Sequence, residues 1–175
     1  MTLPGMSFPD DEVVEAFRAF WITGSTNEDW SAWADHFTED VDYVERQLGT
    51  MQGREAVRTW ITELMSVSYD VHAVLNWYIV AGDRVVFDMW NRYFHPDPQK
   101  PPIDFAGLTV LTYGGNGLFK REEDYWDQAT ARTAYAEWST ACREWGSKGD
   151  PDHLAALDAQ RRADQLESLQ SGRIR

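Results

Sequence analysis

Apolar side chains recur every three to four residues in the first third of the chain, which predicts three amphipathic helices. The first begins near Asp10, where acidic residues favour the positive end of the helix dipole, and ends at Gly24. The second opens at Asn27 and the third near Gly53. The apolar positions of the three helices are Val13, Val14, Phe17, Phe20 and Trp21; Trp30, Trp33, Ala34 and Phe37; and Val57, Trp60, Ile61, Leu64 and Met65.

A short strand is predicted between the second and third helices. It follows Asp40, and its side chains alternate, so that Tyr43 and Glu45 share one face while Asp42 and Val44 share the other. A phenol and a carboxylate side by side among many aromatic residues predict a pocket lined by a few polar groups.

Four further stretches have the composition and the turn punctuation of strands. Their short connections predict antiparallel pairing. Helices followed by such a meandering sheet are typical of an α+β fold. The stretches are 71–80, 84–94, 103–113 and 118–126.

The pattern becomes helical again after Asp127. The first helix of this tail is expected to pack on the sheet or on a partner subunit, and Gly146 begins the break before a last helix at Pro151. The expected apolar stripes are Tyr135, Trp138, Cys142 and Trp145, and then Leu154, Leu157, Leu166 and Leu169.

Composition narrows the class of protein. The 175 residues suffice for one domain with a real core, and a formal charge of −13 disfavours nucleic acids and anionic membranes as partners. The single cysteine, Cys142, excludes an internal disulfide and a multi-thiolate metal site. With no apolar run of about 20 residues and no secretory signal at the start of the chain, we expect a soluble, cytoplasmic protein.

Three segments resemble the SnoaL-like members of the nuclear transport factor 2-like superfamily. They are WADHFTEDV (33–41), GREAV (53–57) and EDYWD (123–127), and their order and spacing carry the resemblance. It implies a cone-shaped, curved antiparallel sheet packed on the N-terminal helices. We assign 1–130 to this SnoaL-like barrel domain and 131–175 to a C-terminal helical extension of the same domain.

The resemblance also implies site residues. Tyr43 stands where limonene epoxide hydrolase has a water-orienting tyrosine, and Asp124 where it has an aspartate that helps to activate the water. Glu45 stands at the general-base aspartate of ketosteroid isomerase. Trp90 and Arg92 stand where the hydrolase has an Arg and an Asp, which disfavours epoxide hydrolysis by that mechanism.

We therefore predict that Glu45 is a general base, Asp124 a second acid and Tyr43 a polarising donor, because carboxyl groups in a water-poor pocket have separated pKa values. Tyr43 alternatively fills the mouth of the core. The residues predicted to contact substrate are Trp33, Trp60, Trp126, Asp88, Trp90 and Arg92. The last three share one face of a strand, and the alternative is that this face is turned to water.

The predicted function is cofactor-independent acid/base chemistry on an apolar, oxygen-bearing small molecule, by isomerisation, cyclisation, dehydration or hydration. No spacing of histidines and acids predicts a metal site, and no cofactor is expected. The alternatives are a non-catalytic small-molecule-binding protein of the same fold and a protein whose C-terminal helices pair two chains. A homodimer is expected from the resemblance.

Overall fold

The computed structural model describes residues 8–68 and 70–171, so the outer limits of the two predicted parts, 1–130 and 131–175, lie outside it. The chain forms an α+β structure, as predicted. In chain order the elements are α1 (Asp10–Trp21), the π-helical turn η1 (Ile22–Thr26), α2 (Trp30–Trp33), the 3-10 turn η2 (Ala34–His36), β1 (Phe37–Glu45), β2 (Gly49–Gln52), α3 (Arg54–Val67), β3 (Val71–Ala81), β4 (Arg84–Tyr93), β5 (Ile103–Gly115), β6 (Leu118–Trp126), α4 (Gln128–Trp145) and α5 (Pro151–Ser171).

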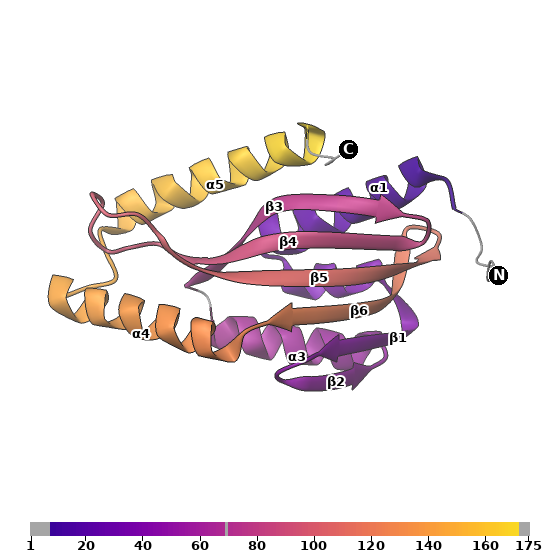
Figure 1. Cartoon of the computed structure of the whole chain (residues 1–175), viewed down its shortest axis with the longest axis horizontal. Helices are drawn as coiled ribbons and strands as arrows, with labels where there is room; N and C mark the ends of the chain where they lie inside the picture. The colour runs from indigo at the N-terminus through magenta and orange to yellow at the C-terminus, as the bar shows by residue number, and fades with distance from the viewer. Residues whose placement is uncertain (1–7, 69, 172–175) are drawn as a thin grey trace.

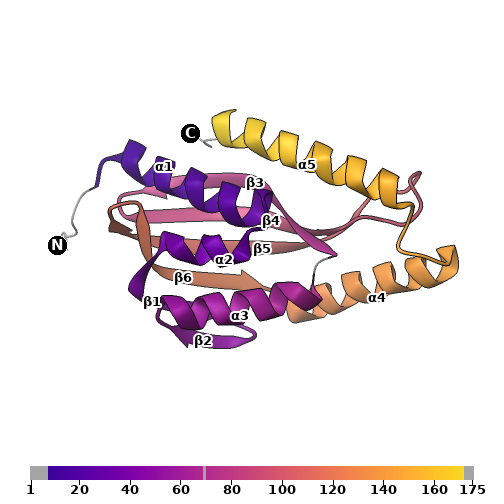
Figure 2. The same ribbon diagram turned by 180° about the vertical axis from the view of Figure 1, so that it is seen from behind.

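The six strands form one sheet in the order β2-β1-β6-β5-β4-β3. Neighbours pair antiparallel except β1 and β6, which run parallel. The N-terminal helices α1, α2 and α3 cover one face of the sheet, and α5 lies along its β3 edge (Figures 1 and 2). Helix α4 continues from β6 and packs on β5 and β4.

Aromatic rings of α1 pack against β3, β4 and α2. Phe17 packs on Tyr78 and Phe87, with ring centroids 4.7 and 5.3 Å away. Phe20 packs 5.2 Å from Trp33. The close approach of α1 and α2 requires Gly24, because a Cβ atom there would lie 2.3 Å from the Trp33 ring.

Two boundaries near the first strand differ from prediction. The second helix is shorter than expected, and β1 begins at Phe37 instead of after Asp40. Strand β2, which the sequence pattern does not predict, forms a hairpin with β1. Most of its residues are exposed, so its sequence carries no apolar alternation that could have predicted it.

Only part of the predicted apolar stripe of α4 packs on the sheet. Trp138 is buried: it stacks on Tyr93 with ring centroids 5.0 Å apart, and its Nε1 donates to the Phe94 carbonyl at 3.1 Å. Tyr135 and Trp145 are 55% and 51% exposed. The sheet accepts only one edge of this helix, so the outer aromatic rings remain half in solvent.

The predicted leucine stripe of α5 is also wrong in part, because Leu166 is 41% exposed while Arg161 and Gln165 are buried together with Leu169. These polar side chains satisfy backbone groups of the barrel. Gln165 accepts from the Leu75 N–H at 2.6 Å, and Arg161 donates to the Ser25 carbonyl at 2.7 Å.

Arg161 also lies within a charged cluster. It pairs with Asp158 at 2.7 Å and with Glu28 at 3.1 Å, and the more exposed Arg162 pairs with the same two acids. His72 contacts Glu28 at 2.7 Å. Glu28, His72 and Asp158 are close enough to share a metal ion, but two guanidinium groups already neutralise the carboxylates. We infer that this cluster of Glu28, His72, Asp158, Arg161 and Arg162, called the ionic clamp below, holds α5 against η1 and β3.

The clamp predicts unequal effects for its two arginines. Arg161→Ala leaves the two acids and the carbonyl groups of Ser25 and Ala73 without their buried donor, so we expect a loss of roughly 3 kcal/mol, the low end for breaking a buried ion pair. Arg162→Ala, the matched control, is expected to cost less than about 1 kcal/mol because its pairs reach solvent. Urea unfolding of both variants measures the difference; equal losses would contradict the clamp.

Candidate functional site

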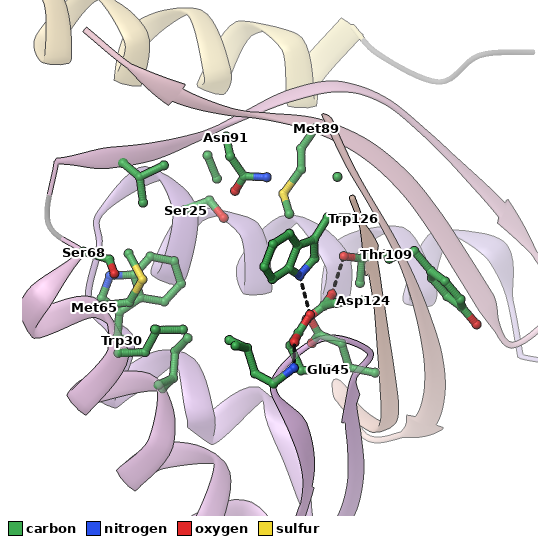
Figure 3. Close-up of a pocket in the computed structure, with 18 of the residues that line it drawn as sticks. Ser25, Trp30, Glu45, Met65, Ser68, Met89, Asn91, Thr109, Asp124 and Trp126 are labelled. Carbon is green, nitrogen blue, oxygen red and sulfur yellow. Dashed lines mark hydrogen bonds between the residues drawn. The ribbon is translucent and has the colours of Figure 1, made fainter. Parts of the chain in front are cut away.

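A cavity of about 390 Å³ lies between the sheet and the N-terminal helices. Its wall is mainly aromatic and aliphatic, with the carboxyl groups and Thr109 gathered on β1, β6 and β5, and with Ser25, Ser68 and Asn91 elsewhere in the wall (Figure 3). The aromatic lining residues are Phe20, Trp21, Trp30, Trp33, Tyr43, Trp60, Phe87, Tyr93, Phe105, Tyr125 and Trp126. Such a cavity, apolar with a few convergent polar groups, is typical of a small-molecule site.

Both predicted polar residues of β1 face this cavity. Tyr43 is 3% exposed and Glu45 is 4% exposed. The parallel register of β1 and β6 places Tyr43 opposite Glu122, and Glu45 opposite Asp124. Alternation on β6 turns Glu122, Asp124 and Trp126 to the cavity as well.

Glu45 is held by three N–H donors. Its Oε2 atom accepts from the backbone N–H groups of Gln47 at 2.9 Å and Leu48 at 2.5 Å, where the chain turns from β1 into β2. Its Oε1 atom accepts from the indole N–H of Trp126. Because an N–H group can only donate, both oxygens of Glu45 act as acceptors.

Asp124 is oriented by two hydroxyl groups. Tyr43 donates to its Oδ2 atom, and Thr109 on β5 donates to its Oδ1 atom at 2.5 Å. Burial raises the pKa of Asp124 to about 6, against the opposing effect of these two hydrogen bonds. Asp124 is therefore mainly ionised at pH 7 yet accepts a proton near neutrality.

Glu122 was not singled out by the sequence analysis, although alternation from Asp124 along β6 places it on the same face. Its side chain is buried, and burial together with the charge of Asp124 raises its pKa well above the usual value. Its Oε2 atom has no hydrogen-bond partner among the described residues. Glu122 therefore holds its proton more tightly than an exposed glutamate does, directly beside Asp124.

The pKa of Tyr43 is raised well above 10, first by burial and then by the charge of Asp124. Its hydroxyl group therefore keeps its proton and remains a donor over the working pH range. Because that proton is directed at Asp124, Tyr43 orients the carboxylate and does not point freely at a ligand.

The predicted substrate-contacting residues divide into two groups. Trp33, Trp60 and Trp126 line the cavity. The expectation that Asp88, Trp90 and Arg92 line it is wrong: they lie on the other face of β4, and none belongs to the cavity wall.

The outer face of β4 supplies its own partners, which explains this orientation. Arg92 makes two hydrogen bonds to Asp104 on β5, at 2.9 and 2.7 Å, and Asp88 accepts from Asn76 on β3 at 2.7 Å. Trp90 is 38% exposed. The inner face instead presents Phe87, Met89, Asn91 and Tyr93 to the cavity.

None of the described residues that line the cavity carries a basic side chain. The arginine that follows Glu45, Arg46, is exposed, pairs with Glu123 and lies 4.9 Å from the Tyr125 ring centroid. Arg121 pairs with Asp42 on the outer face of the sheet. The carboxyl groups of the cavity therefore have hydroxyl and N–H partners but no counter-ion from the cavity wall.

A sheet closed by helices over an aromatic cavity defines the class of nuclear transport factor 2-like, or ketosteroid isomerase-like, α+β proteins. The chain belongs to the SnoaL-like domain family, whose model matches residues 13–122. Helices α4 and α5 lie beyond that match. The sequence has no significant match among curated proteins.

Solved structures of the same fold cover the barrel. A hypothetical protein with a ketosteroid isomerase-like fold from Catenulispora acidiphila, in complex with trimethylamine, is 22% identical, with a TM-score of 0.56 over 73% of this chain and 95% of its own. TerC, co-crystallised with polyporic acid, is 19% identical, with a TM-score of 0.56 over 73% and 97%. An epoxide hydrolase from Mycobacterium tuberculosis is 16% identical, with a TM-score of 0.59 over 75% and 95%. At these identities the likeness shows the fold.

The raised pKa of Asp124 gives a stability prediction with a defined sign. The folded chain keeps this proton up to about pH 6, whereas the unfolded chain releases it near 3.8, so ionisation destabilises the folded state. From about pH 4 to about pH 7 the wild type loses about 2 kcal/mol through this group. The Asp124→Asn variant cannot ionise at this position and does not suffer this loss. Urea unfolding at the two pH values is therefore expected to show the free energy of unfolding of the variant, relative to that of the wild type, rising by this amount between about pH 4 and about pH 7.

The control is Asp40→Asn on the exposed part of β1. A surface substitution of this kind is expected to change stability by less than about 0.5 kcal/mol at either pH. A difference between Asp124→Asn and the wild type that stays constant with pH would contradict the assignment.

Proposed function

We propose that the chain is a cofactor-independent acid/base enzyme that moves a proton within an apolar, oxygen-bearing small molecule. The observation that carries the proposal is Asp124, a carboxylate oriented by two hydroxyl groups in an aromatic cavity, with a pKa of about 6. A general base works best when its pKa lies near the operating pH and its carboxylate is held in place.

The roles of the three acids follow from their partners. Asp124 takes a proton from carbon, and Glu122, whose pKa burial raises well above its usual value, donates one to the oxygen on which negative charge develops. Tyr43 is a positioning residue for Asp124. This assignment moves the base from Glu45 to Asp124, because burial raises the pKa of Asp124 to about 6.

Relatives support a small molecule as the ligand. One structural neighbour was solved in complex with trimethylamine and TerC was co-crystallised with polyporic acid, and other neighbours are an epoxide hydrolase and a putative isomerase. Because one fold serves many reactions, the proposal of proton transfer rests on the carboxyl groups of this chain. We keep a cytoplasmic location as part of the proposal, on the strength of the single cysteine. No described helix is long and apolar enough to cross a membrane.

A second candidate function is binding without turnover. It is favoured by the hydrogen bonds themselves, because every oxygen of Glu45 and Asp124 already has a donor from the protein. In that case the carboxyl groups fix the shape of the cavity, and the ligand leaves unchanged.

Proton abstraction can be tested with 5-nitrobenzisoxazole, a small apolar carbon acid. Transfer of its C3 proton to Asp124 breaks the N–O bond and releases 2-cyano-4-nitrophenolate, which is followed by absorbance. We expect the wild type to accelerate this reaction, with a rate that rises through about pH 6 to a plateau. Asp124→Asn is expected to lower the rate at least about 100-fold, the usual contribution of a positioned base.

The matched control is Glu123→Gln, which removes the neighbouring carboxylate on the outer face of β6 and is expected to keep the wild-type rate. No acceleration by the wild type, together with measurable binding of the probe, would favour the second candidate function. An unchanged rate in Asp124→Asn would transfer the role of base to another group.

We also propose that two chains associate through the outer side of α4. Tyr135 and Trp145 leave large apolar surface in solvent, and such rings are enriched at protein interfaces. We expect light scattering to give the mass of a dimer for the full chain and of a monomer for Tyr135→Lys combined with Trp145→Lys. A wild-type monomer would rule out this pairing.

A further inference from the structure

We propose that the ligand of the cavity carries a positive charge, as a protonated amine or a quaternary ammonium group on an apolar skeleton. This inference extends the proposed function, because it names the chemical class that the same cavity would accept. It rests on the composition of the cavity wall, which combines three carboxyl groups with aromatic rings and has no basic side chain among the described lining residues.

The first step is charge balance. Glu45, Glu122 and Asp124 all line the cavity, and no described lining residue is basic. Burying an ionised carboxylate without an opposite charge is costly, and the hydrogen bonds to Glu45 and Asp124 offset this cost only in part. A ligand that brings a positive charge supplies the counter-ion that the protein lacks, whereas an anionic ligand meets repulsion.

The second step is the nature of the wall. Tyr43 lies at the centre of an aromatic cluster, with the Trp60 centroid 5.1 Å away and the Trp33 centroid 6.2 Å away. Trp126 donates its indole N–H to Glu45 and turns its ring into the cavity beside that carboxylate (Figure 3). Faces of tryptophan and tyrosine rings attract cations within about 6 Å and accept alkyl groups equally well.

The third step separates two roles for the acids. Asp124 is the proposed proton acceptor, and its hydroxyl partners come from the sheet. Glu45 stands next to it in the register, fixed by N–H donors, and is available as a stationary negative charge. The formal charge of −13 also raises the local concentration of organic cations around the protein and lowers that of anions.

The test compares probes that share a shape and differ in charge. The [4-(hydroxymethyl)phenyl]trimethylammonium ion and its neutral isostere 4-tert-butylbenzyl alcohol differ only in N⁺ against C. 4-tert-Butylbenzoate supplies a negative charge. Isothermal titration calorimetry of the full chain at about pH 7.5 is expected to give at least tenfold tighter binding of the cation than of the isostere, and the weakest binding for the anion.

Variants locate the effect. Glu45→Gln and Asp124→Asn are each expected to reduce the preference for the cation several-fold while retaining the isostere, which also shows that the variants are folded. Glu123→Gln, on the outer face, is expected to keep the full preference.

The quaternary ion does not titrate, so any weakening of its binding at about pH 5 reports on the protein. The ionisable groups that face the ligand are Glu45, Glu122 and Asp124, of which burial raises the pKa of Asp124 to about 6, and Tyr43 keeps its proton.

The outcomes are distinguishable from those of the proposed function. Equal binding of the cation and the isostere, or tighter binding of the benzoate, would overturn the charged ligand while leaving proton abstraction from 5-nitrobenzisoxazole to stand. A preference for the cation that survives in both cavity variants would also overturn it, because the charge would then be recognised elsewhere. A cation preference in a protein that does not turn over the benzisoxazole would support the charged ligand and count against the enzyme.

Discussion

The parallel pairing of β1 with β6 is the constraint on which the candidate site depends. These strands are far apart in the sequence, and their register sets Tyr43 opposite Glu122 and Glu45 opposite Asp124. A slip of β1 by one residue would turn Tyr43 and Glu45 to the outer face, where Asp42 and Glu123 now pair with arginines. This register thus determines that Glu45 and Glu122 are buried and that the Tyr43 hydroxyl group orients Asp124. Because burial raises the pKa values of Glu122 and Asp124, the register also determines the direction of these shifts.

Much of this arrangement follows from the sequence, because β1 and β6 obey simple alternation. Tyr43 and Glu45 were assigned to the cavity side correctly, and the rule that places Asp124 there also places Glu122, although this acid was overlooked. Strand β4 resisted the same reasoning. Both of its faces carry large apolar side chains, Phe87 on one and Trp90 on the other, so the pattern did not distinguish the inner face from the outer one. The ion pair of Arg92 with Asp104 becomes evident only when β5 is aligned beside β4.

The C-terminal helix shows a different limit of sequence reasoning. Hydrophobic periodicity finds helix faces that bury apolar surface, but α5 binds the barrel largely through polar groups. Arg161 and Gln165 are buried because they complete backbone hydrogen bonds of η1 and β3, at Ser25 and Leu75. Those backbone groups cannot be read from side-chain patterns, since any residue type offers them. The division into a barrel over 1–130 and an extension over 131–175 stays a prediction, although the match of the family model ends at 122.

The position of α5 bears on the energetics of the cavity. Ionisation of Asp124 lowers the stability of the folded chain, because burial penalises the charged form and no described residue of the cavity wall supplies a cation. The cavity also lowers stability, because its lining side chains lack the van der Waals contacts of a filled core. Sites of this kind exist only when the surrounding structure is stable enough to hold them open. Arg161 on α5 donates a hydrogen bond to the Ser25 carbonyl, and Ser25 lines the cavity. Helix α5 therefore stabilises one segment of the cavity wall without contributing a lining residue from its described part. A ligand with a positive charge would act on the same balance from inside, because it would relieve the charge of the carboxylates and fill the hollow at once.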